Sequence, residues 1–310
     1  MKWLFCLLVF MAFPAWADDA ISDSEAISWL KRMSDASRKL PYEGIFVVQT
    51  GDRMQTVQVE NHPKGLSSES RLVVLDGQPR EVRCVKNESV TLAWGANGQR
   101  LERHLGTRHF PDLLPEDVSK LVNYYSLHLG KNIRVAGQEC QLIDLVPKDQ
   151  YRWGYRLCAE QYTGLPIKAV MVGDNGRPLL QYAFVKVREG ATGHVNADFP
   201  VGTPVADLNP VVDSPLVVKQ LPPGYSQLVA VMRKLPNRDA EVEHWIFSDG
   251  LNHISMFVEP APEHMVNAKG QSSRGLVNLM ISKYGNYKVT VLGDAPLPAV
   301  AFVANNLELR

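Results

Sequence analysis

The chain has 310 residues, which suits about two domains, and 33 basic against 33 acidic residues give it zero formal net charge. The basic residues form no cluster, which argues against a nucleic-acid-binding protein, because phosphates require grouped Lys and Arg side chains.

Residues 1–17 have the parts of a secretory signal peptide: a positive start, an apolar stretch and a small-x-small cleavage motif that ends at Ala17. The apolar stretch is shorter than the roughly 20 residues of a membrane-spanning helix. The sequence therefore predicts cleavage between Ala17 and Asp18, not a membrane anchor. We expect an exported, periplasmic protein that begins at Asp18.

Apolar residues at three- and four-residue steps predict a helix from Ser22 to Leu40. Alternating runs between Gly44 and Trp94 predict short strands. Residues 101–115 are interpreted as a loop. A second helix is expected to start at Pro115, because Pro and acidic residues favour a first turn.

Residues 138–187 read as three successive β-hairpins, because each alternating run is cut by turn residues. We predict that Ile143 lies opposite Tyr155 and Leu145 opposite Trp153, which gathers these side chains on one apolar face. Three charged residues would then lie on the other, wet face: Asp144, Arg152 and Arg156. Alternation with period two fixes which face each residue takes.

Three cysteines remain after cleavage, which suggests one disulfide and one free thiol in an oxidising compartment. In the predicted register Cys140 lies opposite Cys158, where Cα atoms are about 4.5–5.5 Å apart and a disulfide fits. A slip of two residues would keep the apolar face but separate the pair, so both outcomes stay open. Cys84 is then the free thiol.

Between residues 189 and 213 Gly, Pro, Asn and Asp replace the periodic pattern, which indicates a linker. A second unit follows over 214–310, with several predicted strands and a terminal apolar helix from Pro296 to Leu307. Few helices, many short strands and no alternation of strand and helix place the chain in the α+β class with antiparallel sheets.

The motifs of enzymes, metal sites and cofactor sites are missing from the sequence, so we expect no catalytic residue, no metal and no cofactor. What remains is a set of apolar and aromatic residues on predicted strands. One interpretation is ordinary core beneath the helices; the other is a partly covered cleft for an apolar ligand. The set comprises Trp94, Ile143, Leu145, Trp153, Tyr155, Tyr182 and Phe184.

Several short motifs, in order and at matching spacing along nearly the whole mature chain, resemble the MucB/RseB family of periplasmic regulators. They include residues 75–82, the stretch from Pro147 to Tyr155 (PKDQYRWGY), Leu221 to Tyr225 (LPPGY), Asp249-Gly250-Leu251 and residues 257–260.

The resemblance implies an amino-terminal domain (18–188) similar to lipoprotein carriers, with an open, curved antiparallel sheet and helices on its concave side. It implies a smaller α+β domain (214–310) after the linker. The implied function is to bind the periplasmic region of a membrane-anchored anti-sigma factor and shield it from proteolysis until lipopolysaccharide or another acyl-chain ligand causes release. A lipid or lipoprotein carrier is the alternative. The oligomeric state, monomer or homo-oligomer, stays open.

Overall fold

The computed structural model describes residues 23–64, 67–85, 88–95, 98–190, 208–235, 240–266 and 269–310. The predicted signal peptide with its cleavage site at Ala17 and Asp18, and most of the predicted linker, lie outside this part of the chain. The described residues form mainly antiparallel strands, with two α-helices and one short 3-10 helix.

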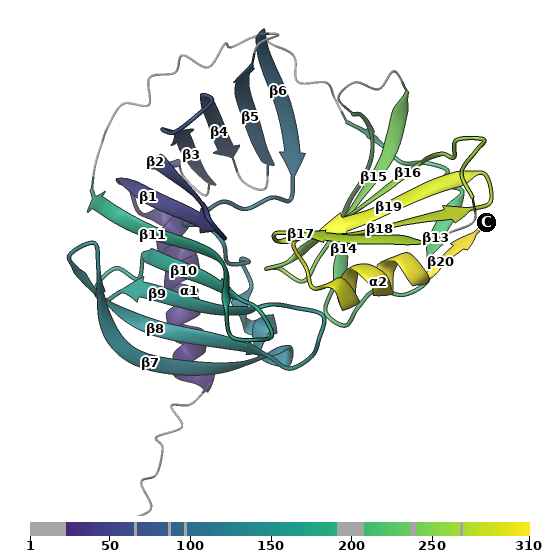
Figure 1. The fold of residues 1–310 in the computed structure, drawn as a ribbon. Coiled ribbons are helices and arrows are strands. Elements are labelled where there is room, and N and C mark those ends of the chain that lie inside the picture. Colours follow the sequence, from purple (N-terminus) through teal and green to yellow (C-terminus); the bar gives the residue numbers. More distant parts are fainter. Residues whose placement is uncertain are drawn as a thin grey trace, which may run out of the picture.

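An 11-stranded sheet forms the first and larger unit, in the order β6-β5-β4-β3-β2-β1-β11-β10-β9-β8-β7. Its outer strands β6 and β7 do not pair with each other, so the sheet stays an open arc (Figure 1). The strands are β1 (Tyr42–Thr50), β2 (Arg53–Lys64), β3 (Ser67–Val74), β4 (Arg80–Val85), β5 (Glu88–Gly95), β6 (Gly98–Leu105), β7 (Tyr125–Val135), β8 (Gln138–Pro147), β9 (Gly154–Glu160), β10 (Pro166–Val172) and β11 (Pro178–Glu189).

Helix α1 (Asp23–Lys39) lies across the concave side of this sheet. It contacts β2 and β3 in one half of the arc and β7 and β10 in the other half, which requires a position inside the curve. Its buried residues recur at helical spacing, as predicted. Acidic residues in the first turn and basic residues in the last turn suit the helix dipole.

Three elements of the large sheet differ from the sequence-based prediction. Residues 101–105, interpreted as part of a loop, belong to edge strand β6, and edge strand β7 was not predicted. The predicted helix after Pro115 is the 3-10 helix η1 (Val118–Asn123), and the Asp117 side chain caps it by accepting a hydrogen bond from the N–H of Ser119. Edge strands pair on one side only, which weakens the requirement for a regular apolar alternation.

The register between β8 and β9 is shifted by two residues from the predicted one. Ile143 lies opposite Leu157, and Leu145 lies opposite Tyr155. The prediction of the two faces is still correct for these residues, because a two-residue shift preserves the alternation. Trp153 lies in the loop before β9, so its predicted place on the strand is wrong.

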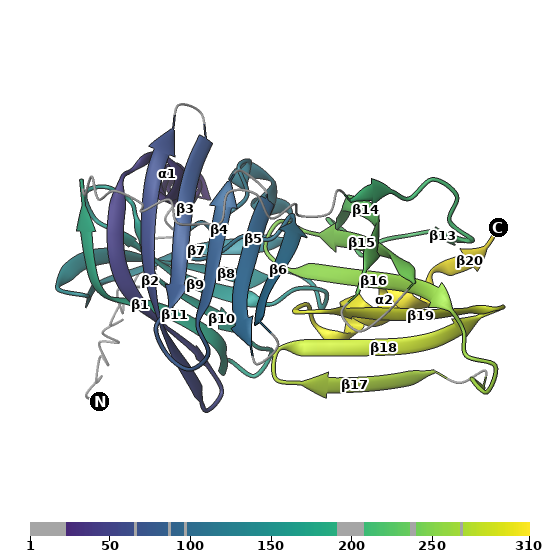
Figure 2. The ribbon, with the colours of Figure 1, turned by 90° about the horizontal axis from the view of Figure 1, so that it is seen from above.

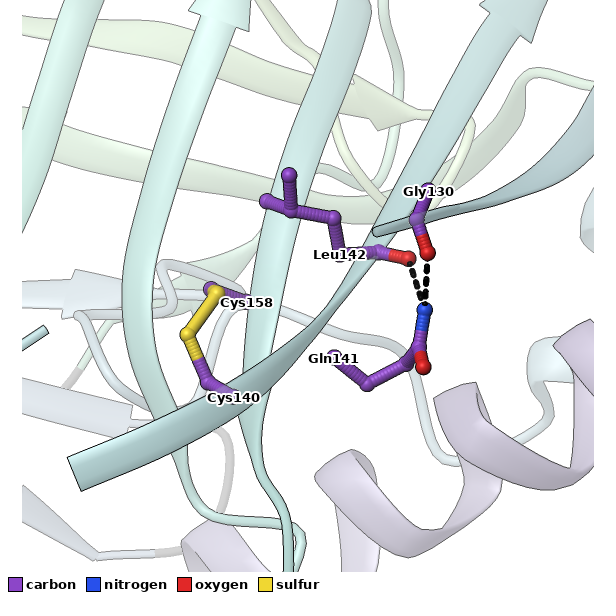
Figure 3. The surroundings of a disulfide bond; sticks show 5 residues. All are labelled: Gly130, Cys140, Gln141, Leu142 and Cys158. Atoms are coloured by element: carbon purple, nitrogen blue, oxygen red, sulfur yellow. Dashed lines mark hydrogen bonds between the residues drawn. A yellow bond between two sulfur atoms is a disulfide. The ribbon is translucent and has the colours of Figure 1, made fainter. Parts of the chain in front are cut away.

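Cys140 and Cys158 form a disulfide although this register places Cys140 opposite Glu160 (Figure 3). The two cysteines are diagonal neighbours, with Cα atoms 5.5 Å apart. The expectation that a two-residue slip would separate them is therefore wrong. Twist between adjacent strands shortens one diagonal, and the neighbouring pair β7/β8 carries a register shift after Leu129, where such twist increases.

A 7-stranded sheet forms the second unit, in the order β12-β14-β15-β16-β19-β18-β17 (Figure 2). Helix α2 (Leu297–Asn305) packs on β18 and β19, and its buried residues belong to a second apolar core. A two-stranded sheet, β13 (Leu216–Val218) with β20 (Leu307–Leu309), completes the unit. The strands of the main sheet are β12 (Asn209–Pro210), β14 (Ser226–Lys234), β15 (Glu241–Ser248), β16 (His253–Pro260), β17 (Gly270–Arg274), β18 (Val277–Tyr284) and β19 (Tyr287–Gly293).

Candidate functional site

An aromatic cluster occupies the middle of the concave face. Phe46 on β1 lies opposite Phe184 on β11, and Tyr182 precedes Phe184 by two residues on β11. The loop after β6 lays Phe110 on these rings: Phe110 stacks on Tyr182 at 5.1 Å and meets Phe46 edge-on at 5.0 Å between centroids. Such offset and edge contacts are the preferred geometries of aromatic pairs. The cluster thus fixes the loop to the sheet.

Two cavities lie on the concave face, one on each side of this cluster. The outer cavity, of about 230 Å³, is lined by apolar residues of β1 to β4 together with His109, Phe110 and Tyr182. The inner cavity, of about 90 Å³, is lined by residues of three regions: the loop after β6, strands β9 to β11 including Tyr182, and the second unit. Tyr182 lines both cavities, whereas the loop residues divide between them: His109 and Phe110 line the outer cavity, and Thr107 and Arg108 line the inner one.

Ionic contacts hold the same loop to helix α1. Arg38 on α1 pairs with Asp112 at 2.7 Å, and Arg108 pairs with Asp112 at 3.4 Å. The Ser34 hydroxyl donates a hydrogen bond to the carbonyl of Pro115 at 3.0 Å. The loop is thus attached both to the sheet, by Phe110, and to the helix.

A buried arginine joins the two sheets. The side chain of Arg152 is fully buried and contacts Asp149 at 2.9 Å, Asp249 at 3.1 Å and the carbonyl oxygen of Pro223 at 2.5 Å. The prediction that Arg152 lies on the wet face is wrong, because residues about seventy to a hundred positions later in the chain cover it.

Aromatic rings complete the surroundings of this guanidinium, which lies 4.6 Å from the ring centroid of Tyr124 and 5.8 Å from those of Tyr125 and Tyr225. Burial alone would lower the pKa of Arg152, but Asp149 and Asp249 outweigh that effect, so its pKa lies above the ordinary value. The charge is therefore permanent and fully paired.

Trp153 and Tyr155 extend the junction next to Arg152. The Trp153 indole N–H donates to the carbonyl oxygen of Asp294 at 2.6 Å. The Tyr155 hydroxyl donates to the carbonyl oxygen of Leu251 at 3.2 Å. Burial raises the pKa of Tyr155 well above its ordinary value, so it remains a neutral donor. Both residues thus bind the second unit.

Gly224 shows how closely the two units approach. Its φ is +81°, in the left-handed region, and a Cβ there would lie 2.7 Å from the ring of Tyr124. Only glycine fits both the backbone conformation and the contact. Three of the motifs that carry the family resemblance meet at this junction: residues 147–155, 221–225 and 249–251.

The predicted apolar residues separate into three groups in the structure. Ile143, Leu145, Tyr155 and Phe184 are buried in the core of the first unit, whereas Tyr182 is partly exposed between the two cavities. Trp153 lies at the junction, and the side chain of Trp94 lies outside the described residues.

Sequence reasoning missed two central residues, Phe110 and Arg152. Phe110 belongs to a segment without alternation, and a cis bond joins it to Pro111, so no strand or helix pattern marks it. Arg152 follows the turn motif Pro147 to Gln150. Arg152 lies within one of the motifs that resemble the family, and this was the one sequence signal that could have identified it.

The Cys140–Cys158 disulfide supports the first unit away from this junction. Next to it, the Gln141 side-chain amide donates to the carbonyl oxygens of Gly130 at 2.6 Å and Leu142 at 2.9 Å (Figure 3). Gly130 lies at the register shift of β7, so Gln141 satisfies a carbonyl that the shift leaves outside the ladder. Cys84 is a free thiol, and burial raises its pKa to about 12.

Among the described residues, no group of three or more His, Cys, Asp and Glu side chains is placed to hold a metal ion. Within that same part of the chain, no helix has both the length and the apolar character that crossing a membrane requires.

Comparison with known proteins gives matches over nearly the whole chain. The chain is 28% identical over 304 residues to the sigma factor AlgU regulatory protein MucB of Pseudomonas aeruginosa, covering 95% of this chain and 92% of the relative. It is 24% identical over 291 residues to the sigma-E factor regulatory protein RseB of Escherichia coli K12, covering 90% and 89%.

Solved structures agree with these matches. A crystal structure of MucB in complex with MucA(peri) superposes with a TM-score of 0.73 at 26% identity, covering 92% of this chain and 99% of that chain. Residues 25–209 match the MucB/RseB N-terminal domain, and residues 212–308 match the MucB/RseB C-terminal domain. The chain therefore belongs to the MucB/RseB family.

Proposed function

We propose that this protein is a periplasmic regulator that binds the periplasmic region of a membrane-anchored anti-sigma factor, protects it from proteolysis and releases it when an amphiphile binds. The observation that carries the proposal is the similarity over 92% of the chain to MucB solved in complex with MucA(peri). The proposal includes export, with a signal peptide removed after Ala17, and a non-catalytic mode of action.

Within this proposal, residues 18–188 form the carrier-like domain, 189–213 the linker and 214–310 the partner-binding domain. Two features support this division into two units with different functions. Each sheet has its own apolar core. The junction around Arg152 contacts both units, so a change in one unit alters the contacts of the other. A ligand releases a partner only if it binds the free conformation better than the bound one.

The second candidate function is a lipid or lipoprotein carrier, which the two apolar cavities of the concave face favour. A carrier does not require the second unit with its own sheet and helix. A regulator requires both units, because one unit binds the ligand that acts as the signal and the other unit binds the partner.

A protease-protection assay separates the two functions. The periplasmic segment of the cognate anti-sigma factor is digested with and without the purified protein, in lipid-free buffer and with lipopolysaccharide. The regulator predicts protection in lipid-free buffer and its loss with lipopolysaccharide. If no protection occurs in lipid-free buffer while the protein still binds lipid, the carrier function takes its place.

A further inference from the structure

A buried histidine of the second unit accepts a hydrogen bond from an arginine. On β15, Nδ1 of His244 lies 3.2 Å from Nη1 of Arg233 on the neighbouring strand β14. A guanidinium has donors only, so Nδ1 is the acceptor and carries no proton. The proton of the neutral ring is then on Nε2, which donates to the hydroxyl of Ser255 on β16 at 3.0 Å. The ring also stacks on Phe257, with 4.2 Å between the centroids.

Two other histidines near the junction lack this restriction. Nε2 of His253 lies 3.1 Å from the carbonyl oxygen of Gly106, which only accepts, so His253 donates there in its neutral and in its protonated form. Nε2 of His109 lies 3.2 Å from the hydroxyl of Ser89, which can accept as well as donate. Of these three histidines, His244 is therefore the one whose hydrogen bond is lost when the ring gains a proton.

Arg233 faces the outer edge of the first sheet. That edge is strand β6, the strand of the large sheet next to the second unit in Figure 2. Burial lowers the pKa of Arg233, and the charge of Glu102 on β6 opposes this effect. Directly after β6, a Cβ on Gly106 would lie 3.1 Å from the side chain of Leu228 on β14. The arginine therefore lies between the histidine of β15 and the carboxylate of β6.

The face of β15 that carries His244 is buried, although helix α2 packs on the opposite face. Phe247, on the opposite face, belongs to the apolar core beneath α2. His244 is 5% exposed, and Val242 and Ile246, which share its face, are 2% and 8% exposed. Strand β6 of the first unit is the element whose charges reach this face. The approach of the two units therefore contributes to the burial of His244.

The groups around the His244 ring make its protonation unfavourable while the two units are in contact. Burial, then Arg233 and His104, lower its pKa from 6.5 to about 3. A ring freed from these surroundings has the ordinary pKa, so the contact is most stable above about pH 6.5 and weakens as the pH falls towards 3. The neighbouring groups are Arg233 on β14, His104 on β6 at 3.7 Å from Glu102, the uncharged Ser255 and Phe257 on β16, and further along β16 Glu259, which pairs with Lys288 at 2.9 Å.

We propose that His244 and Arg233 form an acid-sensitive latch between the second unit and strand β6 of the first unit. Protonation turns Nδ1 of His244 into a donor, so the bond to Arg233 is lost and two cations face each other. The charged ring then requires water, which reaches it when β6 moves away. The junction around Arg152 stays closed, because Arg152 keeps its charge. The latch goes beyond the proposed function, because it responds to protons and not to an amphiphile.

The test follows the separation of the two units by fluorescence energy transfer in the whole mature protein. Dyes are attached at two exposed positions, Gln78→Cys between β3 and β4 and Glu263→Cys after β16, and Cys84→Ser removes the free thiol. Between pH 6 and pH 4 the ratio of separated to closed molecules should rise at least about tenfold per pH unit, because one proton binds the separated form more tightly. A ratio that stays constant over this range would overturn the latch.

His244→Asn identifies the histidine that is responsible. Its amide oxygen can still accept from Arg233, but it does not titrate, so the slope of the logarithm of the ratio against pH should fall by about one. His128→Asn is the matched control, because His128 is an exposed histidine on the opposite edge strand β7 and should not affect the slope. If His244→Asn responds to acid as strongly as the unaltered protein, the latch does not exist.

Nitrogen-15 NMR of the histidine rings at pH 7 gives a second measurement on the unaltered protein, if His244→Asn fails to fold. His244 should carry its proton on Nε2 and none on Nδ1, and a proton on Nδ1 would overturn the latch. No anti-sigma factor and no amphiphile are present in these experiments. Their failure therefore contradicts the latch alone, whereas loss of protease protection in lipid-free buffer contradicts the regulator alone.

Discussion

Replacing Arg152 with leucine should lower the free energy of unfolding by about 3–5 kcal/mol. The substitution leaves the buried carboxylate of Asp249 without its cation and the carbonyl oxygen of Pro223 without its donor. Asp249 keeps hydrogen bonds from the backbone N–H groups of Leu251 and Asn252, at 3.0 Å and 2.7 Å. These donors keep the loss from the ion pair near the lower end of the range, and the unpaired carbonyl, at about 1–3 kcal/mol, moves the total towards the upper end.

Arg156→Leu is the matched control, because Arg156 also pairs with an aspartate, Asp144, at 2.7 Å, but on the exposed face of the same hairpin. Exposed pairs contribute about 0–1 kcal/mol, since water already screens both charges. Urea unfolding followed by tryptophan fluorescence and by circular dichroism measures both variants. Trp153 lies at the junction. In Arg152→Leu, fluorescence should therefore detect the opening of the junction before circular dichroism changes.

A double-mutant cycle completes the experiment. Arg152→Leu combined with Asp249→Leu removes both charges, so it should be less destabilising than the sum of the single variants, with a coupling of about 0.5–3 kcal/mol. If Arg152→Leu costs no more than Arg156→Leu, or if the cycle is additive, the buried pair does not hold the two units together and the reasoning is refuted.

Three further predictions concern covalent and ionisation states. Mass mapping without reductant should find Cys140 linked to Cys158, and serine at both positions should reduce stability by about 3 kcal/mol for the 18-residue separation; two alkylatable thiols in the native protein would contradict the bond. Burial lowers the pKa of His244 from 6.5 to about 3. The unfolded chain then binds a proton that the folded chain rejects, so this residue's contribution to stability is full above about pH 6.5 and falls as pH drops towards 3. An NMR titration that found an ordinary midpoint would rule this out. Amino-terminal sequencing of the exported protein should begin at Asp18, and a retained first methionine would exclude cleavage.

The sequence by itself determined the strands of the hairpins between residues 138 and 187 and the faces of most of their residues. Alternation placed Ile143 and Leu145 on the buried face and Asp144 and Arg156 on the exposed face, where they form an ion pair. Turn residues located the hairpins for the same reason: a side-chain period of two and a few special backbone conformations are local properties. The resemblance motifs supplied the family, which near-full-length matches bear out.

Only the tertiary structure decided register, burial of charge and the shape of the concave face. A two-residue shift between β8 and β9 leaves every side chain on its face, so alternation cannot choose between the two registers. Local sequence predicts that Arg152 is an exposed residue of a hairpin. In the structure it is buried, because Asp249, 97 positions later in the chain, pairs with it. Phe110 has no periodic neighbours and is buried by rings on β1 and β11. In each case the stabilising contacts join segments that are far apart in the chain, so the local sequence does not predict them.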